Sequence, residues 1–532
     1  MGFPFQRPEP AGAPARPASA PARPAGAAGR VASRRGALAS GLIGASLVAF
    51  AVVMVLGPSA AVPRVGAGGA LVWLHARPSD AVVITLVRVA ALAGALGTAV
   101  GLAAVSRGWR PSIRQLVGAG IVVVAVFVFL PPAGSTDVLN YASYGRIASL
   151  GHSPYVMTPA QLHRTDDAVG VLTPAAWRSA PTVYGPVATA AQWAAGELGG
   201  GSMARIVFWI RLGNALAFLA TGLALLRLAG PDQVRRARVA LLWTVNPLMA
   251  FWLIGSGHVD VLIALFTVAA LLVLRWRRRV LAAVSAGIFA GAAIAVKLPY
   301  AIVAAGMLWS HRWPIGAAIT TPMGHRWSWR RLLAGEGKVA GAGAAAVTVS
   351  VSYLWPGAAD TSTLSRRLSA GARFIFYLPQ VLAARPALLG ALVLAGTVAV
   401  AILLARGLPQ DEQRTPGVRL MLALAIASLV VLPVQTPWYD ALIFVLLPLM
   451  PATGLDYVLL TRCLLLTELV LPGAAPDSGT LSILAARISH FGLFIVILVL
   501  IAGSLRGAWQ SPPRQPRQPV TALADAGHEE MR

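Results

Sequence analysis

Long apolar runs separated by short polar breaks are the dominant pattern of this chain. The runs have no polar face over about 18 to 25 residues, which is typical of membrane-spanning helices and differs from the alternation of β-barrel strands. They predict an all-α polytopic integral membrane protein with about 13 to 14 transmembrane helices. The expected spans are 37–57, 81–105, 115–132, 206–228, 238–254, 259–275, 280–296, 299–313, 338–356, 386–405, 418–434, 440–455, 458–472 and 480–504.

The two ends of the chain lack this apolar pattern. Residues 1–35 are rich in Pro, Ala, Gly and Arg, and they predict a disordered tail. The apolar run that begins near Ala37 is too long and too far from the start for a secretory signal. We therefore expect a transmembrane domain over 36–505, with a long connection at 133–205, followed by a second disordered tail at 506–532.

The charged residues indicate how the spans are oriented. The chain has 44 Lys and Arg residues and only 19 Asp and Glu residues, a net charge of +25. The basic residues gather in short connections such as "RWRRRV" and "HRWSWRRLL", where the positive-inside rule uses them as cytoplasmic anchors. This placement predicts cytoplasmic termini, an extracytoplasmic 133–205 loop, a plasma-membrane location and no nucleic-acid partner. The single cysteine, Cys463, lies within an apolar run and provides no disulfide framework.

The stretch "STDVLNYASYGRIASLGHSPYV" opens the long outer loop. Ser135 or Thr136 can cap a short helix with an aspartate in its first turn, and the helix dipole favours the ionised form of that carboxylate. An ordinary capped interfacial helix would have the same pattern. Spacings of three and four place four polar side chains along one face: Asp137, Asn140, Tyr141 and Tyr144.

Two further outer segments carry ionisable residues at span ends. In "GSGHVDVL", His258 and Asp260 follow two glycines that suggest a tight turn or a close backbone approach, although Asp260 could simply satisfy free N–H groups at a helix start. In "AIAVKLPY", Lys297 stands among apolar residues two positions before Pro299, which breaks the helix. A cation there either reaches lipid headgroups or meets an anion.

The remaining outer segments suit contact with membrane lipids or with the protein's own outer surface. Residues 177–195 contain Pro186 at the start of a second amphipathic helix, and residues 364–382 mix arginines with aromatic residues. The sequence contains no G-x-x-x-x-G-K-[ST] phosphate loop, and the cytoplasmic connections are too short for a nucleotide domain. Energy for a reaction would therefore have to arrive in an activated, membrane-carried substrate.

Four ordered motifs together resemble one enzyme family. "DVLNYASYGRIASLGHSPY", "WRSAPTVYGPV", "NPLMAFWLIGSGHVDVL" and "AVKLPY" are similar to the actinobacterial polyprenol-phosphomannose-dependent α-1,6-mannosyltransferases, which are GT-C glycosyltransferases. The likeness extends over about residues 115–310 in the right order, and the second half matches mainly in hydropathy.

This resemblance implies a polyprenyl-phosphate-mannose donor, a lipid-linked mannan acceptor of lipomannan and lipoarabinomannan assembly, and inversion at the sugar carbon. Asp137 stands where the family's loop carboxylate is expected and is the candidate catalytic base. No cofactor and no metal ligands are predicted, and dependence on a divalent metal stays open. The candidates for binding the donor phosphate or sugar are Lys297, His258, Arg146, Tyr141, Asn140, Tyr144 and Asp260.

Other functions stay open at this stage. A transporter or flippase would also have many spans, but it should show related halves and polar groups near the midplane, whereas the polar residues here gather at one face. A related transferase that passes arabinose to a glycan or mannose to a protein would differ from the expected enzyme in only a few sugar contacts. Sequence alone separates these transferases poorly.

Overall fold

The computed structural model describes residues 27–310, 336–352, 354, 386–409, 417–431, 435–474 and 479–509. These residues form helices and connecting loops, with no strand among them. The predicted tails over 1–26 and 510–532, and the aromatic and basic segment at 364–382, lie outside the described residues.

The described residues of each predicted span are mostly helical, and these helices build the body of the protein. They are α1 (Ala27–Leu56), α2 (Asp80–Ser106), α3 (Ile113–Phe129), α8 (Met203–Ala229), α9 (Gln233–Val239), α10 (Pro247–Ala250), α11 (Asp260–Val273), α12 (Arg279–Val296), α13 (Ala301–Ser310), α16 (Glu336–Ser352), α19 (Pro386–Gly407), α20 (Val418–Val431), α21 (Ala441–Leu446), α22 (Leu455–Val470) and α23 (Thr480–Leu505). Helix α1 begins within the segment that the sequence assigned to the N-terminal tail, whereas α23 ends at the predicted boundary.

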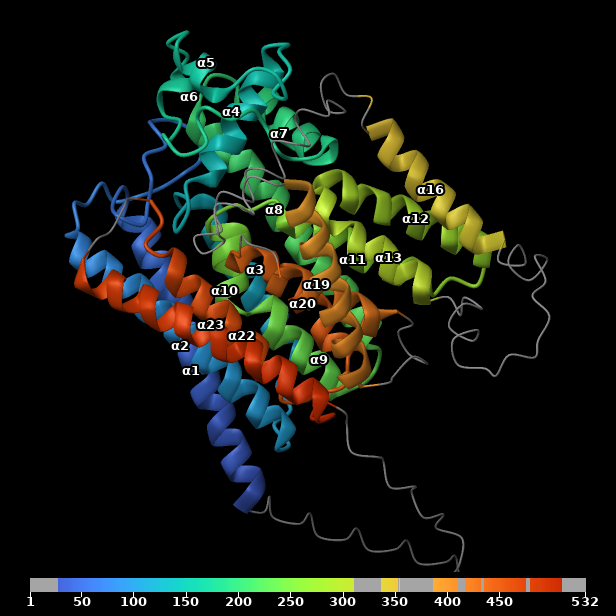
Figure 1. Cartoon of the computed structure of the whole chain (residues 1–532). Coiled ribbons are helices and arrows are strands. Elements are labelled where there is room, and N and C mark those ends of the chain that lie inside the picture. The colour runs from blue at the N-terminus through green and yellow to red at the C-terminus, as the bar shows by residue number, and fades with distance from the viewer. Residues whose placement is uncertain are drawn as a thin grey trace, which may run out of the picture.

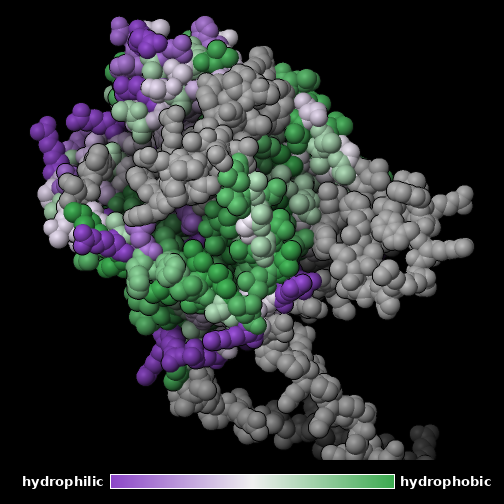
Figure 2. Space-filling view, in the orientation of Figure 1, coloured by the Kyte–Doolittle hydropathy of each residue, from purple (hydrophilic) through white to green (hydrophobic). Residues whose placement is uncertain are grey.

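Five helical segments of the described chain are long and apolar enough to cross a membrane. They are Val31–Leu56, Asp80–Ser106, Met203–Ala229, Gln233–Gly255 and Thr480–Leu505. Seven further apolar helices have between 10 and 17 residues. The space-filling view shows an apolar band between polar groups at either end (Figure 2). The prediction of an all-α polytopic membrane protein is confirmed.

Prolines divide two of the predicted spans into shorter pieces. Within Gln233–Gly255, Pro247 cannot continue the hydrogen-bond ladder, so Asn246 accepts from the N–H groups of Leu248 and Met249 and starts a new helix. The predicted span 440–455 is instead a chain of η4 (Pro437–Asp440), α21 and η5 (Leu447–Leu449). It ends near Leu449 because Pro448 and Pro451 interrupt it.

The long connection at 133–205 folds as an outer layer over one end of the helical body (Figure 1). Its helices are α4 (Asp137–Ser149), α5 (Pro159–His163), α6 (Ala168–Val171) and α7 (Pro186–Gly199). Helices α4 and α7 cross in close contact, because a Cβ on Gly145 would lie 2.2 Å from the Gln192 carbonyl oxygen and one on Gly196 would lie 2.3 Å from the Gly145 oxygen. Only glycine permits this approach, which holds α4 firmly above the helix ends.

Candidate functional site

Helix α4 begins at the residue that the sequence singled out. The Ser135 hydroxyl accepts a hydrogen bond from the Asp137 N–H at 3.1 Å, so Ser135 rather than Thr136 is the capping side chain. The helix ends at Ser149, and Gly151 follows with a φ of +80°. The predicted short helix is therefore present, with Asp137 in its first turn.

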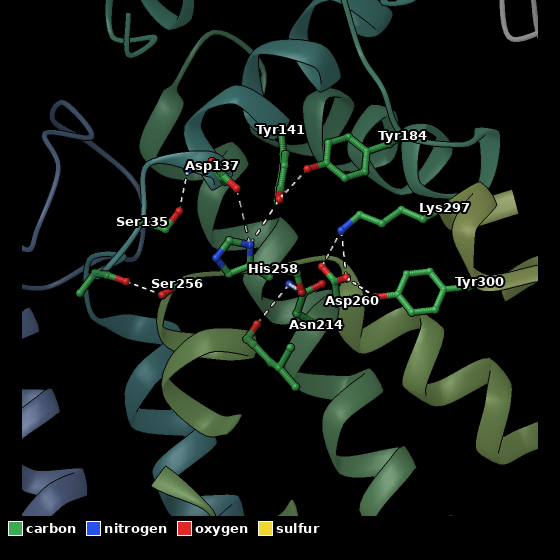
Figure 3. A network of polar contacts seen from close by, with 12 residues as sticks. Ser135, Asp137, Tyr141, Tyr184, Asn214, Ser256, His258, Asp260, Lys297 and Tyr300 are labelled. Carbon is green, nitrogen blue, oxygen red and sulfur yellow. Dashed lines mark hydrogen bonds and ion pairs between the residues drawn. The ribbon is translucent and has the colours of Figure 1, made fainter. Parts of the chain in front are cut away.

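Asp137 and His258 face one another across this end of the protein (Figure 3). The Asp137 Oδ2 lies 3.9 Å from His258 Nδ1, with the Asp137 side chain 23% exposed and the imidazole fully buried. Gly257 makes this possible: its φ is +84°, and a Cβ there would lie 2.9 Å from Val138 Cγ2. The glycines before His258 thus serve the tight, close-packed turn that the sequence indicated.

Helix α8 holds the turn from beneath. Arg211 donates to the carbonyls of Phe127, Leu130 and Ile254, and Asn214 donates to the His258 carbonyl at 3.1 Å. Sequence analysis did not single out either residue, because a polar side chain in the middle of an apolar run shows its partners only once the fold is known.

Two tyrosines continue the network from α4. The Tyr141 hydroxyl lies 3.4 Å from His258 Nδ1, and the Tyr184 hydroxyl donates to the Tyr141 hydroxyl at 3.0 Å. If Tyr184 supplies that proton, Tyr141 keeps its own hydrogen for His258 Nδ1. The His258 Nε2 atom is buried and has no hydrogen-bond partner within the described part of the chain.

Lys297 and Asp260 form a buried ion pair beside these rings. Lys297 Nζ lies 2.9 Å from both Asp260 carboxylate oxygens, and the Tyr300 hydroxyl donates to Asp260 Oδ1 at 3.0 Å. The alternative that Asp260 caps the N–H groups of its own helix is wrong: it is the first residue of α11, but its side chain turns toward Lys297. A carboxylate buried to 1% exposure requires such a partner.

Aromatic rings flank the ammonium group of Lys297. Its Nζ lies 4.5 Å from the centroid of the Tyr439 ring and 5.3 Å from that of Tyr184. The main chain fixes this arrangement, because the Gly185 N–H donates to the Val296 carbonyl at 2.9 Å. The helix break before Pro299 therefore places Lys297 against other protein side chains. Only 12% of its own side chain is exposed.

The C-terminal half closes the site with a motif to which sequence analysis gave no role, "QTPWYD" at 435–440. The Trp438 ring stacks on His258 with centroids 3.6 Å apart and an interplanar angle of 10°. Asp440 is ion-paired with Arg462 of α22. Two signals could have found this motif, and also Tyr184 and Tyr300. The charge map predicts the same side for all three segments, and tyrosines stand next to the predicted helix breaks.

Burial sets the protonation of the cluster. It raises the pKa of Asp137 to about 6, although the charge of Lys297 acts in the opposite direction. The carboxyl is still largely ionised at neutral pH, because that pKa lies below 7. Burial also lowers the pKa of His258 well below its usual range, which keeps the imidazole neutral. Burial would lower the pKa of Lys297, but Asp260, Tyr439 and Asp137 together outweigh it, and the net shift is upward.

Three of the predicted site residues lie outside the network of Asp137, His258 and Lys297. Arg146 is nine residues, or about 13 Å along the helix, from Asp137, and its Nε donates to Asp167 at 2.9 Å. The Tyr144 hydroxyl donates to the Ala180 carbonyl at 3.0 Å within the outer layer. Asn140 is 3% exposed, and its side-chain atoms have no hydrogen-bond partner among the described residues.

The described residues offer no candidate metal site. They contain no group of three or more His, Cys, Asp or Glu side chains that could hold a metal ion. Asp167, which stands in the "TDDA" stretch, instead accepts from the N–H groups of Val169 and Gly170 and caps α6.

Comparison of the sequence with known proteins shows which family the chain belongs to. The sequence profile described as alpha-(1→6)-mannopyranosyltransferase, N-terminal domain, matches residues 38–312, more than half of the chain. The chain belongs to this family. The match includes Asp137, His258, Asp260 and Lys297, and it ends before the motif that contains Trp438.

Two relatives support the same assignment over shorter segments. Alpha-(1→6)-mannopyranosyltransferase B of Corynebacterium glutamicum is 27% identical over 146 residues, which cover 27% of this chain and 24% of the relative. A probable alpha-(1→6)-mannopyranosyltransferase of Mycolicibacterium smegmatis is 30% identical over 158 residues, or 29% and 27% of the two chains. The similarity thus spans only about a quarter of each relative. No solved structure matches this chain. The family is one of membrane glycosyltransferases, and the recognition made from the four motifs is confirmed.

Proposed function

We propose that this protein transfers mannose from polyprenyl-phosphate-mannose to a lipid-linked mannan acceptor and forms an α-1,6 linkage in lipomannan and lipoarabinomannan assembly. The observation that carries the proposal is that Asp137 and Lys297 flank one polar network at one end of an apolar helical body (Figure 3). One group can accept a proton and the other can hold a phosphate, and His258, Tyr141 and Tyr184 lie between them.

Asp137 is the proposed general base. A hydroxyl oxygen of the acceptor attacks C1 of the mannosyl group, the bond between C1 and the phosphate oxygen breaks, and the hydroxyl proton passes to the Asp137 carboxylate. Polyprenyl phosphate leaves with the bonding electrons, and the configuration at C1 inverts in a single displacement. The Asp137 carboxylate is suited to this role because it is partly exposed and no described side chain hydrogen-bonds to its oxygens.

Lys297 is the proposed partner of the donor phosphate. Two of its three ammonium hydrogens are directed to Asp260, which leaves one for a phosphate oxygen. Because charge on the phosphate grows as the C1–O bond breaks, this contact is stronger in the transition state than in the bound donor. His258 and Tyr141 lie between the two charged groups and, at 0% and 1% exposure, would shape the sugar site from behind.

The charge map supports an extracytoplasmic site in the plasma membrane. Polar connections on the opposite side contact one another, as Gln233 donates to the Pro111 carbonyl and Arg275 to the Arg227 carbonyl. These connections carry the arginines that the positive-inside rule assigns to the cytoplasm. Under this proposal both termini are cytoplasmic, and the layer formed by α4 to α7 is outside.

Helix α7 is the proposed contact with membrane lipid and with the polyprenyl chain. It begins at Pro186 as the sequence predicted, and it exposes Trp193 and Leu198 to 41% and 60%. An indole together with an aliphatic side chain on a helix beside the apolar band suits the boundary between headgroups and acyl chains.

The direct test uses a membrane preparation from a host that lacks this activity. Membranes that contain the protein are incubated with radiolabelled polyprenyl-phosphate-mannose and a short α-1,6-mannan lipid. We expect label in the mannan product, release by an α-1,6-specific mannosidase and no product with the Asp137→Asn variant. Label transferred to arabinan or to protein, or labelled donor moved across the bilayer without product, would replace this proposal.

A further inference from the structure

The contact between Trp438 and His258 joins the two halves of the chain at the site. The rings are nearly parallel, with centroids 3.6 Å apart, and Trp438 itself is 7% exposed. Trp252 packs behind them, with its ring centroid 5.4 Å from that of Trp438. One face of the imidazole is therefore covered by an indole that comes from outside the matched family region.

The segment that carries Trp438 is anchored from the C-terminal side. Asp440 is ion-paired with Arg462, and Arg462 also donates to the Leu429 carbonyl at 3.2 Å and to the Gln435 side chain at 3.3 Å. Both members of the pair are almost fully buried. The short 3₁₀ turn η4 is therefore fixed at both of its ends, and Trp438 has little freedom to leave the imidazole.

We propose that Trp438 is a positioning residue that holds His258 in a fixed, water-free plane beside Asp137, so that η4 of the C-terminal half completes the active site. The inference rests on the proposed role of Asp137 as the base. A neutral imidazole 3.9 Å from Asp137 leaves the carboxylate free to accept a proton. A hydrated imidazolium at the same distance would pair with the carboxylate and weaken it as a base.

The other ionisable groups around His258 cannot replace the Trp438 ring in keeping the imidazole neutral. Lys297 disfavours a second positive charge, but its own charge is matched by Asp260. Arg211 packs against Gly257 and is committed to three main-chain carbonyls. The titratable and charged groups around the imidazole are Asp137 and Tyr141 from α4, Tyr184 before α7, Arg211 from α8, Asp260 from α11, Lys297 and Tyr300 after α12, and Tyr439 and Asp440 from η4.

The kinetic test compares Trp438→Leu with Trp438→Phe, which keeps an aromatic face. We expect Trp438→Leu to lower kcat about tenfold, within the range of losses caused by small misplacements of reacting groups, with KM little changed. In wild type, kcat/KM should fall on the acid side with a midpoint near pH 6. In Trp438→Leu this acid limb should move to lower pH, because a hydrated His258 takes a proton and stabilises the Asp137 carboxylate. Trp438→Phe should keep the wild-type limb and most of the turnover. The matched control is Trp509→Leu, which removes a tryptophan of similar burial, 5% exposed, and should keep the wild-type profile.

Two further measurements separate this inference from the proposed function. In Trp438→Leu/His258→Asn no imidazolium can form, so the acid limb should return toward the wild-type position; an equal shift in both variants would overturn the inference while Asp137 remained the base. Independently of transfer, diethyl pyrocarbonate followed by mass spectrometry should modify His258 in folded Trp438→Leu and leave it protected in wild type and Trp438→Phe. Equal protection in all three proteins would also overturn it. If Asp137→Asn transfers mannose normally, the proposed role of Asp137 as the base fails, whatever the state of His258; if the wild-type protein transfers no mannose, the proposed function itself fails.

Discussion

Lys297 and Asp260 form a bidentate ion pair at 2.9 Å, and each is the other's charged partner at the end of an apolar helix. The pair changes how a substitution of either residue is interpreted, because neutralising one residue leaves the other as an unpaired buried charge. Breaking a buried pair by removing one member costs about 3 to 5 kcal/mol of stability. A single substitution therefore tests folding as well as chemistry.

The Lys297→Ala variant should lose both abundance and transfer. To separate the two losses, the double variant Lys297→Met/Asp260→Asn removes both charges and should restore insertion. Its turnover should stay low, because no ammonium remains for the leaving phosphate. Membrane abundance and kcat of both variants check this, and wild-type turnover in the double variant would show that Lys297 has only a structural role.

Asp260→Asn should be severe rather than mild. If Asp260 capped its own helix, which the sequence left open, the effect would be mild, because a helix-capping aspartate is replaced well by asparagine. In the structure, asparagine leaves the Lys297 ammonium without its counter-charge, so we expect a decrease in abundance and transfer similar to that of Lys297→Ala. Asp167→Asn, at a carboxylate that does cap a helix, is the matched control and should be mild. Equal, small effects of the two substitutions would contradict this account of the pair.

Arg146→Ala should leave the chemistry intact. Its ion pair with Asp167 is more exposed than the pair of Lys297 and Asp260, at 21% and 12% for the two side chains, so its loss should cost less stability than breaking that pair. Transfer per folded molecule should then stay within about twofold of wild type, since Arg146 lies far along α4 from Asp137. A large fall in kcat at normal abundance would return Arg146 to the list of donor-binding residues.

Membrane orientation can be tested with single cysteines, because Cys463 is the only native thiol. In a Cys463→Ser background, Ser179→Cys in the outer layer and Ser106→Cys at the end of α2 place exposed thiols at opposite ends of the protein. A membrane-impermeant thiol reagent added to intact cells should label position 179 and spare position 106. The reverse pattern would place Asp137 in the cytoplasm.

The sequence predicted the helices well because each apolar run is a local property, and the run boundaries agree with most helix ends. It located Asp137, His258, Asp260 and Lys297, which stand next to glycines, a proline or a predicted helix start. It could not pair Lys297 with Asp260 across 37 residues, and it could not place Trp438 against His258, because such contacts depend on how helices pack. It included Arg146 as a cation close to Asp137 in the sequence, but nine residues of helix separate the two by about 13 Å along the axis.

The most direct test of the whole account is the pH-dependent turnover of Asp137→Asn in the radiolabelled transfer assay. Asparagine keeps the size of aspartate, removes a charge that burial disfavours, and cannot accept a proton, so the variant should insert at normal abundance. Wild-type kcat/KM should fall as the pH drops through about 6, where the carboxylate becomes protonated. Loss of a general base costs a factor of about 10² to 10⁴, so we predict that the variant retains at most about one hundredth of wild-type transfer. Retention of more than about a tenth of wild-type transfer, with the same acid limb, would show that Asp137 is not the base.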